Sequence, residues 1–155
     1  MNGSVNEASA RVRELLERVA SASGVDADVE VHEDQDGVTA EYLGEDLGLL
    51  VGHHGQTIDA IQHLAYRIAF HGDRERKRVT VDAAGYRERR AVALRAAADQ
   101  AAATVLQDHR PVSLEVMSAL ERKVIHEHLK TRHGIETYSE GQEPARRLVV
   151  APLVD

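Results

Sequence analysis

The amino-acid sequence predicts an α+β fold in two parts, and three features of its 155 residues carry that prediction. Segments with apolar residues at helical spacing alternate with short segments in which every second residue is apolar. A long alanine-rich segment, residues 85–109, separates two such groups. The apolar fraction of 43% is typical of a chain that folds. We therefore expect one domain over residues 1–83 and a second over residues 84–155, which includes the alanine-rich helix.

The first domain is predicted to have the element order α-β-β-α-α-β. Its elements are a helix over residues 7–22, a hairpin over 28–44 with its turn at 34–37, a short helix over 46–51, a helix from Gly55 to about Phe70, and a strand over 77–83. Each helix shows apolar residues three or four positions apart, and each strand shows strict alternation. Asp46 is expected to cap the short helix, because its carboxylate can accept from the N–H groups of the first turn.

The second domain is predicted to begin with the alanine-rich helix, since alanine carries the lowest helix cost. Its later elements are a strand over residues 111–117, a helix from 118 to about 132, and two strands over 135–141 and 146–152. Ser118 and Glu121 match a capping box, in which a hydroxyl and a carboxylate each accept from a backbone N–H.

Composition and charge narrow the function. The chain has no cysteine, which excludes disulfides and thiolate metal sites and favours a reducing, cytoplasmic location. It shows neither a signal-peptide core nor an apolar run of the roughly 20 residues that a membrane-spanning helix needs, so no membrane insertion is expected. The net charge is −7, with 8 basic against 16 acidic residues over 1–82 and 11 against 10 over 83–155. A polyanion would therefore bind to local basic patches, at residues 74–78, 87–90 and 146–147.

Gly52 and Gly55 stand between the short helix and the amphipathic helix that follows it. Gly52 alone is equally well explained as a helix C-cap, because glycine accepts a positive φ without a Cβ penalty. A functional interpretation uses both glycines. Without Cβ atoms, a sugar–phosphate backbone can approach the main chain, and the next helix points its N–H groups at a phosphate. Bases can then lie along the groove between that helix and the neighbouring strand.

Arg122 and His126 lie one turn apart on the helix that starts at Ser118. They fall outside the apolar sector of Leu120, Val124, Ile125 and Leu129, and can offer several donors to one anion. A solvated helix face is the alternative explanation on spacing alone. His128 lies inside the apolar sector and is expected to be a buried, hydrogen-bonded core residue.

The segment "LLVGHHGQTIDAIQHLAYRIAF" resembles the GXXG segment of a KH domain, in which the loop clamps about four backbone nucleotides of a single strand. The element order resembles the type II arrangement, a three-stranded sheet with helices on one face. The resemblance implies that Gly52, His53, His54 and Gly55 cradle the nucleic-acid backbone, with Gln56 and Thr57 nearby. Such families often carry Lys or Arg between the glycines. Histidines, largely neutral at pH 7, should attract phosphate less strongly.

The segment "PVSLEVMSALERKVIHEHLKTRHGIETYSEGQEPARRLVV" resembles the R-3-H domain, which is named for its Arg-x-x-x-His motif and binds single-stranded nucleic acid. Together with "GQTIDAIQHL", this ending is similar to the Jag family of bacterial proteins, which pair the two domains. The resemblance implies that Arg122 and His126 contact phosphates and that Arg146 and Arg147 extend the patch.

The expected function is therefore single-stranded RNA binding in the cytoplasm, without enzymatic activity, metal or cofactor. The resemblance implies post-transcriptional regulation linked to cell elongation or envelope growth, and a KH-only protein as partner. Single-stranded DNA is a further candidate ligand. The alternative from another class is a protein–protein interaction or dimerisation module with little nucleic-acid affinity. The two differ in salt dependence, because binding through phosphates weakens with salt and an apolar interface barely responds.

Overall fold

The computed structural model describes residues 3–154, with side chains described from residue 7 onward. The chain divides into two compact units, the first ending at Arg87 and the second starting at Glu88. Helix α4 (Tyr86–Asp108) contains this division. Each unit has a hydrophobic core and a sheet of its own.

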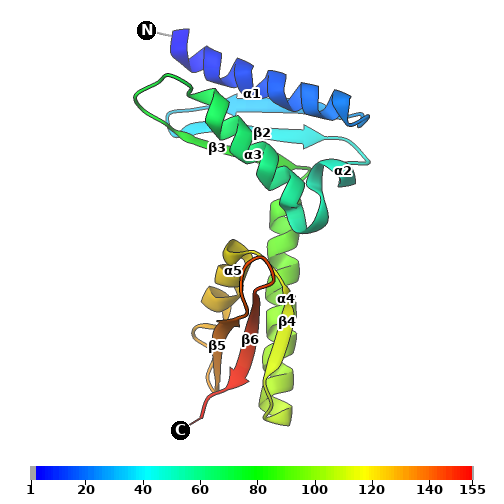
Figure 1. Ribbon diagram of the computed structural model, residues 1–155, viewed down its shortest axis with the longest axis vertical. Coiled ribbons are helices and arrows are strands. Elements are labelled where there is room, and N and C mark those ends of the chain that lie inside the picture. The colour runs from blue at the N-terminus through cyan, green and yellow to red at the C-terminus, as the bar shows by residue number, and fades with distance from the viewer. Residues whose placement is uncertain (1–2, 155) are drawn as a thin grey trace. The chain divides into compact units, whose positions relative to one another are not determined.

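The first unit contains one sheet and its covering helices (Figure 1). Its elements are α1 (Gly3–Ala22), β1 (Asp28–Glu33), β2 (Gly37–Leu43), α2 (Gly48–Val51), the 3-10 helix η1 (His53–Gly55), α3 (Gln56–Ala69) and β3 (Arg78–Ala83). Strand β2 is central, with β1 antiparallel and β3 parallel to it. This α-β-β-α-α-β order is the one that the sequence predicts.

Alternation along the strands puts the buried apolar side chains of this sheet on one face. Val38, Ala40 and Tyr42 of β2 are buried, while Thr39 and Glu41 point the other way. The apolar face packs on α1 and α3 in a single core cluster. The expectation of a three-stranded sheet with helices on one face is therefore confirmed. One detail differs: α2 begins at Gly48 with Leu47 as its N-cap, so Asp46 does not cap it.

Tyr42 ties the sheet to α1. Its side chain is fully buried, and the hydroxyl donates to the Leu16 carbonyl at 2.7 Å. Burial raises the pKa of the Tyr42 phenol well above its ordinary value of about 10. The folded protein therefore keeps this proton at a pH where the unfolded chain loses it, so the stabilisation is complete below about pH 10 and declines above it.

We expect the free energy of unfolding to fall as pH rises above about 10, and to fall less steeply in Tyr42→Phe. At neutral pH the same substitution should cost about 1 kcal/mol, because the Leu16 carbonyl loses its buried partner. Urea unfolding at several pH values measures both effects. Equal alkaline sensitivity of the two proteins would contradict the role given to Tyr42.

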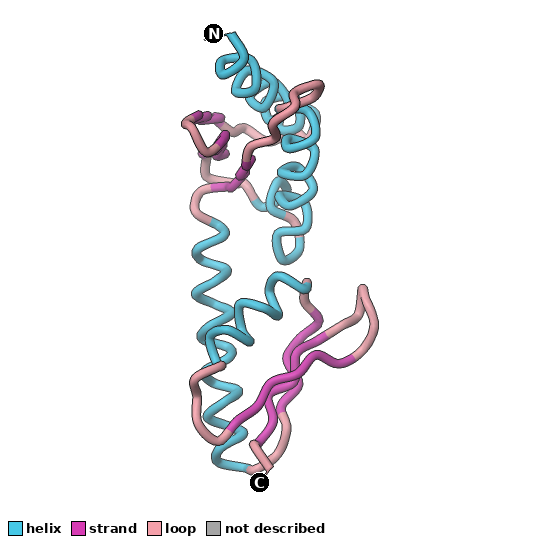
Figure 2. Tube along the Cα trace, turned by 90° about the vertical axis from the view of Figure 1, so that its left-hand side faces the viewer, coloured by secondary structure: helices cyan, strands magenta, loops and turns pink. Residues whose placement is uncertain are grey.

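The second unit is a three-stranded antiparallel sheet with two helices on one side (Figure 2). Its elements are the body of α4, β4 (Val112–Val116), α5 (Ala119–Leu129), β5 (Ile135–Glu140) and β6 (Arg147–Pro152). Strand β6 is central, between β4 and β5. Small residues of α4 are buried in the core of this unit: Ala98 and Ala102 are fully buried, in one cluster with Val105, Leu148 and Val150. The predicted elements of this domain are all present.

Two local expectations about α5 are wrong in part. Ser118 does cap the helix, accepting from the Glu121 N–H at 3.2 Å, but the Glu121 carboxylate pairs with Arg90 of α4 at 2.7 Å and does not complete the box. The buried face of α5 consists of Arg122, Ile125 and Leu129, whereas Leu120 is 75% exposed. The helix is thus rotated relative to the predicted apolar sector, because the polar Arg122 occupies an inward position.

Candidate nucleic-acid interface

The loop between α2 and α3 is shaped by its two glycines. Gly52 ends α2 at φ 73°, and its N–H donates to the Gly48 carbonyl at 2.9 Å. Gly55 has a left-handed conformation at φ 79° and is the N-cap of α3. The C-cap interpretation of Gly52 is therefore confirmed, and Gly55 serves the start of the next helix in the same way.

Neither glycine leaves open space where its side chain would be. A Cβ on Gly52 would lie 2.2 Å from the Thr57 hydroxyl, and a Cβ on Gly55 would lie 2.7 Å from the ring of Tyr86. Gly55 itself is buried. The expectation that both glycines expose a bare main chain is wrong for Gly55, because the Tyr86 ring packs over it. The exposed part of the loop is centred on His53.

His53 and His54 lie at the tip of this loop. Their rings are stacked, with centroids 3.8 Å apart, and His54 has a positive φ of 51°. Gln56 is exposed and Thr57 half-buried at the start of α3, where no side chain caps the first turn. The loop thus presents two imidazoles beside the amino end of a 14-residue helix, an arrangement that favours an anion.

A second basic feature of the first unit is the segment between α3 and β3. It carries Arg74, Arg76, Lys77 and Arg78, with two carboxylates, Asp73 and Glu75, among them. Within the described residues, none of its four cations forms an ion pair, and Arg76 lies over the Tyr66 ring of α3 at 5.8 Å from its centroid. This basic segment leads directly into strand β3. Of the predicted basic patch at residues 87–90, Arg87 belongs to this unit, and it forms an ion pair with Asp59 at 2.7 Å.

The groove between α3 and the edge strand β3 is already bridged by side chains. Gln62 accepts from the Val81 N–H at 2.9 Å, and the Arg87 guanidinium donates to the Val81 carbonyl at 3.0 Å. Arg87 also donates to Gln62 at 3.0 Å. The main-chain groups of Val81 are thus satisfied within the unit, so bases in this groove would meet Gln62 and Arg87 before the strand itself.

The second unit holds a pocket of about 520 Å³ between α5 and the sheet. We call it the cationic pocket; it is lined by Ala119, Arg122, Lys123, His126, Thr137, Tyr138, Ser139, Arg146 and Leu148. The sequence-predicted residues Arg122, His126 and Arg146 all contribute to it. Four basic side chains line this space with the hydroxyl groups of Thr137 and Ser139, and no carboxylate is among the lining residues. In a chain of net charge −7, such a lining is suited to an anion.

Arg122 does not lie on a solvated helix face. Although it is charged, its exposed fraction is only 7%. Its guanidinium donates to the Met117 carbonyl at 2.7 Å and to the Arg146 carbonyl at 3.5 Å, and it forms an ion pair with Glu143. Glu143 is outside the lining of the cationic pocket. Arg122 thus has internal partners as well as a surface in the pocket.

The two histidines of α5 behave differently from each other. His126 is exposed, and its Nδ1 lies 2.6 Å from the Thr137 hydroxyl across the pocket. His128 was expected in the core but lies at the surface, where its Nε2 is 2.9 Å from the Asp99 carboxylate. The rotation of α5 described above explains the difference, because it turns position 128 toward α4 and away from the core.

Arg147 is not brought into the cationic pocket. Successive residues of β6 point to opposite faces of the sheet, and Leu148 and Val150 face the helices. Arg147 therefore lies on the opposite face from Arg146. Sequence reasoning did not single out the residues of β5 in the pocket, Thr137 and Ser139. Their alternate spacing in "IETYSE" was the available signal, since it places both on the face turned toward α5.

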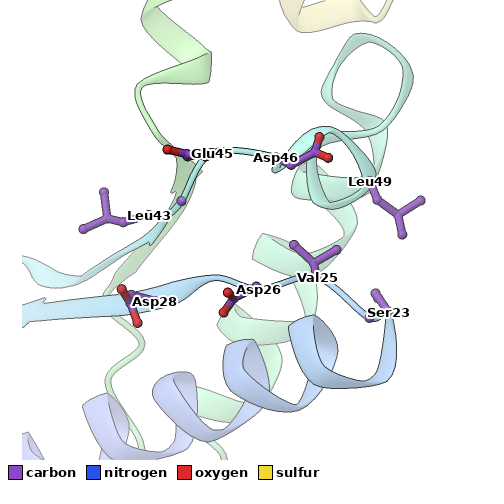
Figure 3. Close-up of a pocket in the computed structure, with 10 residues that line it drawn as sticks. Ser23, Val25, Asp26, Asp28, Leu43, Glu45, Asp46 and Leu49 are labelled. Carbon is purple, nitrogen blue, oxygen red and sulfur yellow. The ribbon is translucent and has the colours of Figure 1, made fainter.

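A larger pocket lies elsewhere and has the opposite charge. It measures about 650 Å³ and lies in the first unit, between the end of α1 and the segment that leads into α2 (Figure 3). Asp26, Asp28, Glu45 and Asp46 line it, and the apolar Leu49 lies at one side of it. Four carboxylates repel a phosphate backbone, so size alone does not identify the nucleic-acid site here.

The fold, the His53–His54 loop and the cationic pocket together define a two-domain binding protein. Its first domain is a type II KH domain and its second is an R-3-H domain. Comparison with known families agrees: the KH domain of KhpA/KhpB matches residues 9–82, and the R-3-H domain matches residues 92–152. The chain belongs to the family that joins these domains, the Jag or KhpB family. Both matched domains are binding domains and not catalytic ones, as the sequence predicts for residues 9–82 and 92–152.

Several relatives cover nearly the whole chain. It is 37% identical over 147 residues to the RNA-binding protein KhpB of Lactiplantibacillus plantarum, covering 94% of this chain and 46% of the relative. It is 36% identical to the proteins of the same name from Clostridium symbiosum and Bacillus subtilis, covering 89% and 88% of this chain and 63% and 66% of those relatives. The chain thus spans about half to two thirds of the length of these relatives. None of the helices in residues 3–154 combines the length and apolarity needed to cross a bilayer.

Proposed function

We propose that this chain binds single-stranded RNA through two separate contact sites. One is the His53–His54 loop with the start of α3, and the other is the cationic pocket. The observation that supports this proposal most strongly is the lining of the cationic pocket. It includes Arg122, Lys123, His126 and Arg146 and no carboxylate. Relatives that share both domains are named RNA-binding proteins, which supports the same ligand for this chain.

The chemistry of the two sites suits a flexible polyanion. Planar guanidinium groups match phosphate oxygens, and hydroxyl groups at the pocket wall can bond to phosphate or ribose. In the first unit, the imidazoles and the uncapped turn of α3 offer donors to a phosphate, and the basic segment 74–78 adds long-range attraction. Two weak sites on one chain raise the overall affinity if one strand can reach both.

The test is fluorescence anisotropy with a labelled oligouridine of about 20 nucleotides at several salt concentrations. Log K should fall by about 0.7 for each phosphate neutralised on a single strand, so three or four contacts give a slope of roughly −2 to −3. An oligodeoxythymidine of the same length tests whether DNA competes. Absence of binding at low salt, or a flat salt response, would contradict the proposal.

His53→Asp should lower the RNA affinity by roughly tenfold, because it replaces a donor with a like charge at the phosphate. Residue 53 is exposed, so the change is expected to leave unfolding by urea unaltered. His133→Asp is the matched control, with the same charge change at an exposed position of the second unit. Equal affinities of the two variants would remove the loop from the site.

A protein partner is a second candidate, and the acidic pocket favours it. Four carboxylates, with the 64% exposed Leu49 at one side of them, are complementary to a basic segment with an apolar residue at one end. One family model describes the KH domains of both KhpA and KhpB, and this pairing in the family name supports a KH-only protein as that partner. Such binding would use the first unit and leave the cationic pocket available for RNA.

The biological role that we propose is post-transcriptional regulation in the cytoplasm, linked to cell elongation or envelope growth. The support is the resemblance to the Jag family in both domains. Crosslinking of the protein to RNA in cells, followed by sequencing, tests this role. Enrichment of transcripts for envelope enzymes is expected, and a set no different from total RNA would contradict it.

A further inference from the structure

We propose that Arg122 is a positioning residue and that Arg146 is the principal phosphate-contacting residue of the cationic pocket. This division of roles rests on the proposed function, because it concerns how the same pocket holds its phosphate. It differs from the role that the Arg-x-x-x-His resemblance assigns, in which the arginine of the motif contacts the strand.

The partners of Arg122 come from two separate segments of the second unit. The Met117 carbonyl lies at the end of β4, while Glu143 and the Arg146 carbonyl belong to the segment between β5 and β6. The Met117 N–H donates to the same Arg146 carbonyl at 3.2 Å. Arg122 therefore fastens the segment that carries Arg146 to the end of β4. Only 9% of its side chain is exposed, so little of it can meet a ligand.

Arg146 shows the complementary features. Its side chain lines the cationic pocket, and its Nε is buried without a hydrogen-bond partner among the described residues. An unsatisfied buried donor costs free energy, and a charged donor costs more than a neutral one. Because Nε has no accessible surface in this structure, an anion satisfies it only after the Arg146 side chain shifts toward the pocket. The guanidinium fork is also the group that pairs with two phosphate oxygens at once.

The position of Glu143 supports the same division. Glu143 holds Arg122 but does not line the pocket, so its carboxylate neutralises the buried guanidinium from outside the ligand space. The charges left facing the pocket are then those of Lys123 and Arg146. A strand phosphate need not displace Glu143 in order to bind.

The experiment compares three variants by salt-dependent anisotropy with the same oligouridine and by urea unfolding. Arg146→Gln should weaken binding by roughly tenfold and reduce the salt slope by about 0.7, with an unchanged unfolding midpoint. Arg147→Gln is its control, because it removes the same charge from the adjacent position on the opposite face of the sheet. It should bind like the original protein.

Arg122→Lys separates positioning from contact. Lysine keeps the charge but cannot reach the Met117 carbonyl, the Arg146 carbonyl and Glu143 together. We expect a lower unfolding midpoint and binding weakened by roughly tenfold although the charge is kept. Full affinity in Arg122→Lys, or in Arg146→Gln, would overturn the division of roles. If the original protein shows no salt-dependent RNA binding, the proposed function fails first, and the two failures are thus distinguishable.

Discussion

Gly55→Asp is expected to destabilise the first unit severely and not merely to block RNA. The substitution adds a Cβ that would lie 2.7 Å from the Tyr86 ring, at a backbone position with φ 79°. A non-glycine residue in such a conformation costs about 1–3 kcal/mol, and overpacking a buried position costs about as much again. We therefore expect the free energy of unfolding to fall by about 2–5 kcal/mol in a urea titration.

The neighbouring glycine Gly48 provides the matched control. A Cβ there meets nothing within 4 Å, so Gly48→Ala should leave stability unchanged or raise it slightly. If Gly55→Asp unfolds at the same urea concentration as the original protein, Tyr86 can move aside and the packing described here is not needed. If Gly52→Asp or Gly55→Asp stays folded, loss of RNA binding in that variant is evidence that the loop contacts the strand. If the variant is unfolded, loss of RNA binding says nothing about such a contact.

Arg122→Ala is expected to destabilise the second unit by about 2–4 kcal/mol. The change removes the donor to the Met117 carbonyl and the partner of Glu143 and leaves a cavity beneath the segment before β6. RNA binding should fall as well, because Arg146 loses its support. Urea unfolding followed by circular dichroism measures the first effect.

The control for Arg122→Ala is Lys123→Ala, the adjacent and exposed cation of the same helix. It should weaken RNA binding through the lost charge and leave the unfolding midpoint unchanged. If Arg122→Ala also keeps its midpoint, Arg122 has no structural role and the assignment from its hydrogen bonds is wrong.

Much of the fold could be predicted from the sequence, because the strands of the first unit alternate strictly and the helices show clear apolar spacing. The hairpin 28–44 and the alanine-rich helix are local patterns of this kind. The rotation of α5 could not be predicted in this way. An arginine counts as polar in any periodicity, and its inward position depends on Glu143, which lies 21 positions further along the chain.

The sequence predicted which residues belong to the candidate site better than it predicted what each of them does there. Arg122, His126 and Arg146 do line one pocket, and the resemblance to the R-3-H domain had grouped these three residues. The packing of Tyr86 over Gly55 could not be anticipated, because contacts between distant residues leave no periodic signal. Arg147 was grouped with Arg146 by adjacency, yet the alternation of a strand separates the two faces.

The most direct test of the account is an NMR titration of the ¹⁵N-labelled protein with oligouridine. We expect the amide signals of His53 to Ile58 and those of Lys123, Thr137 and Arg146 to shift, while the signals of Asp26 and Asp46 at the acidic pocket stay in place. Shifts confined to the acidic pocket, or absent from both cationic sites at saturating RNA, would contradict the claim that these two sites hold the strand.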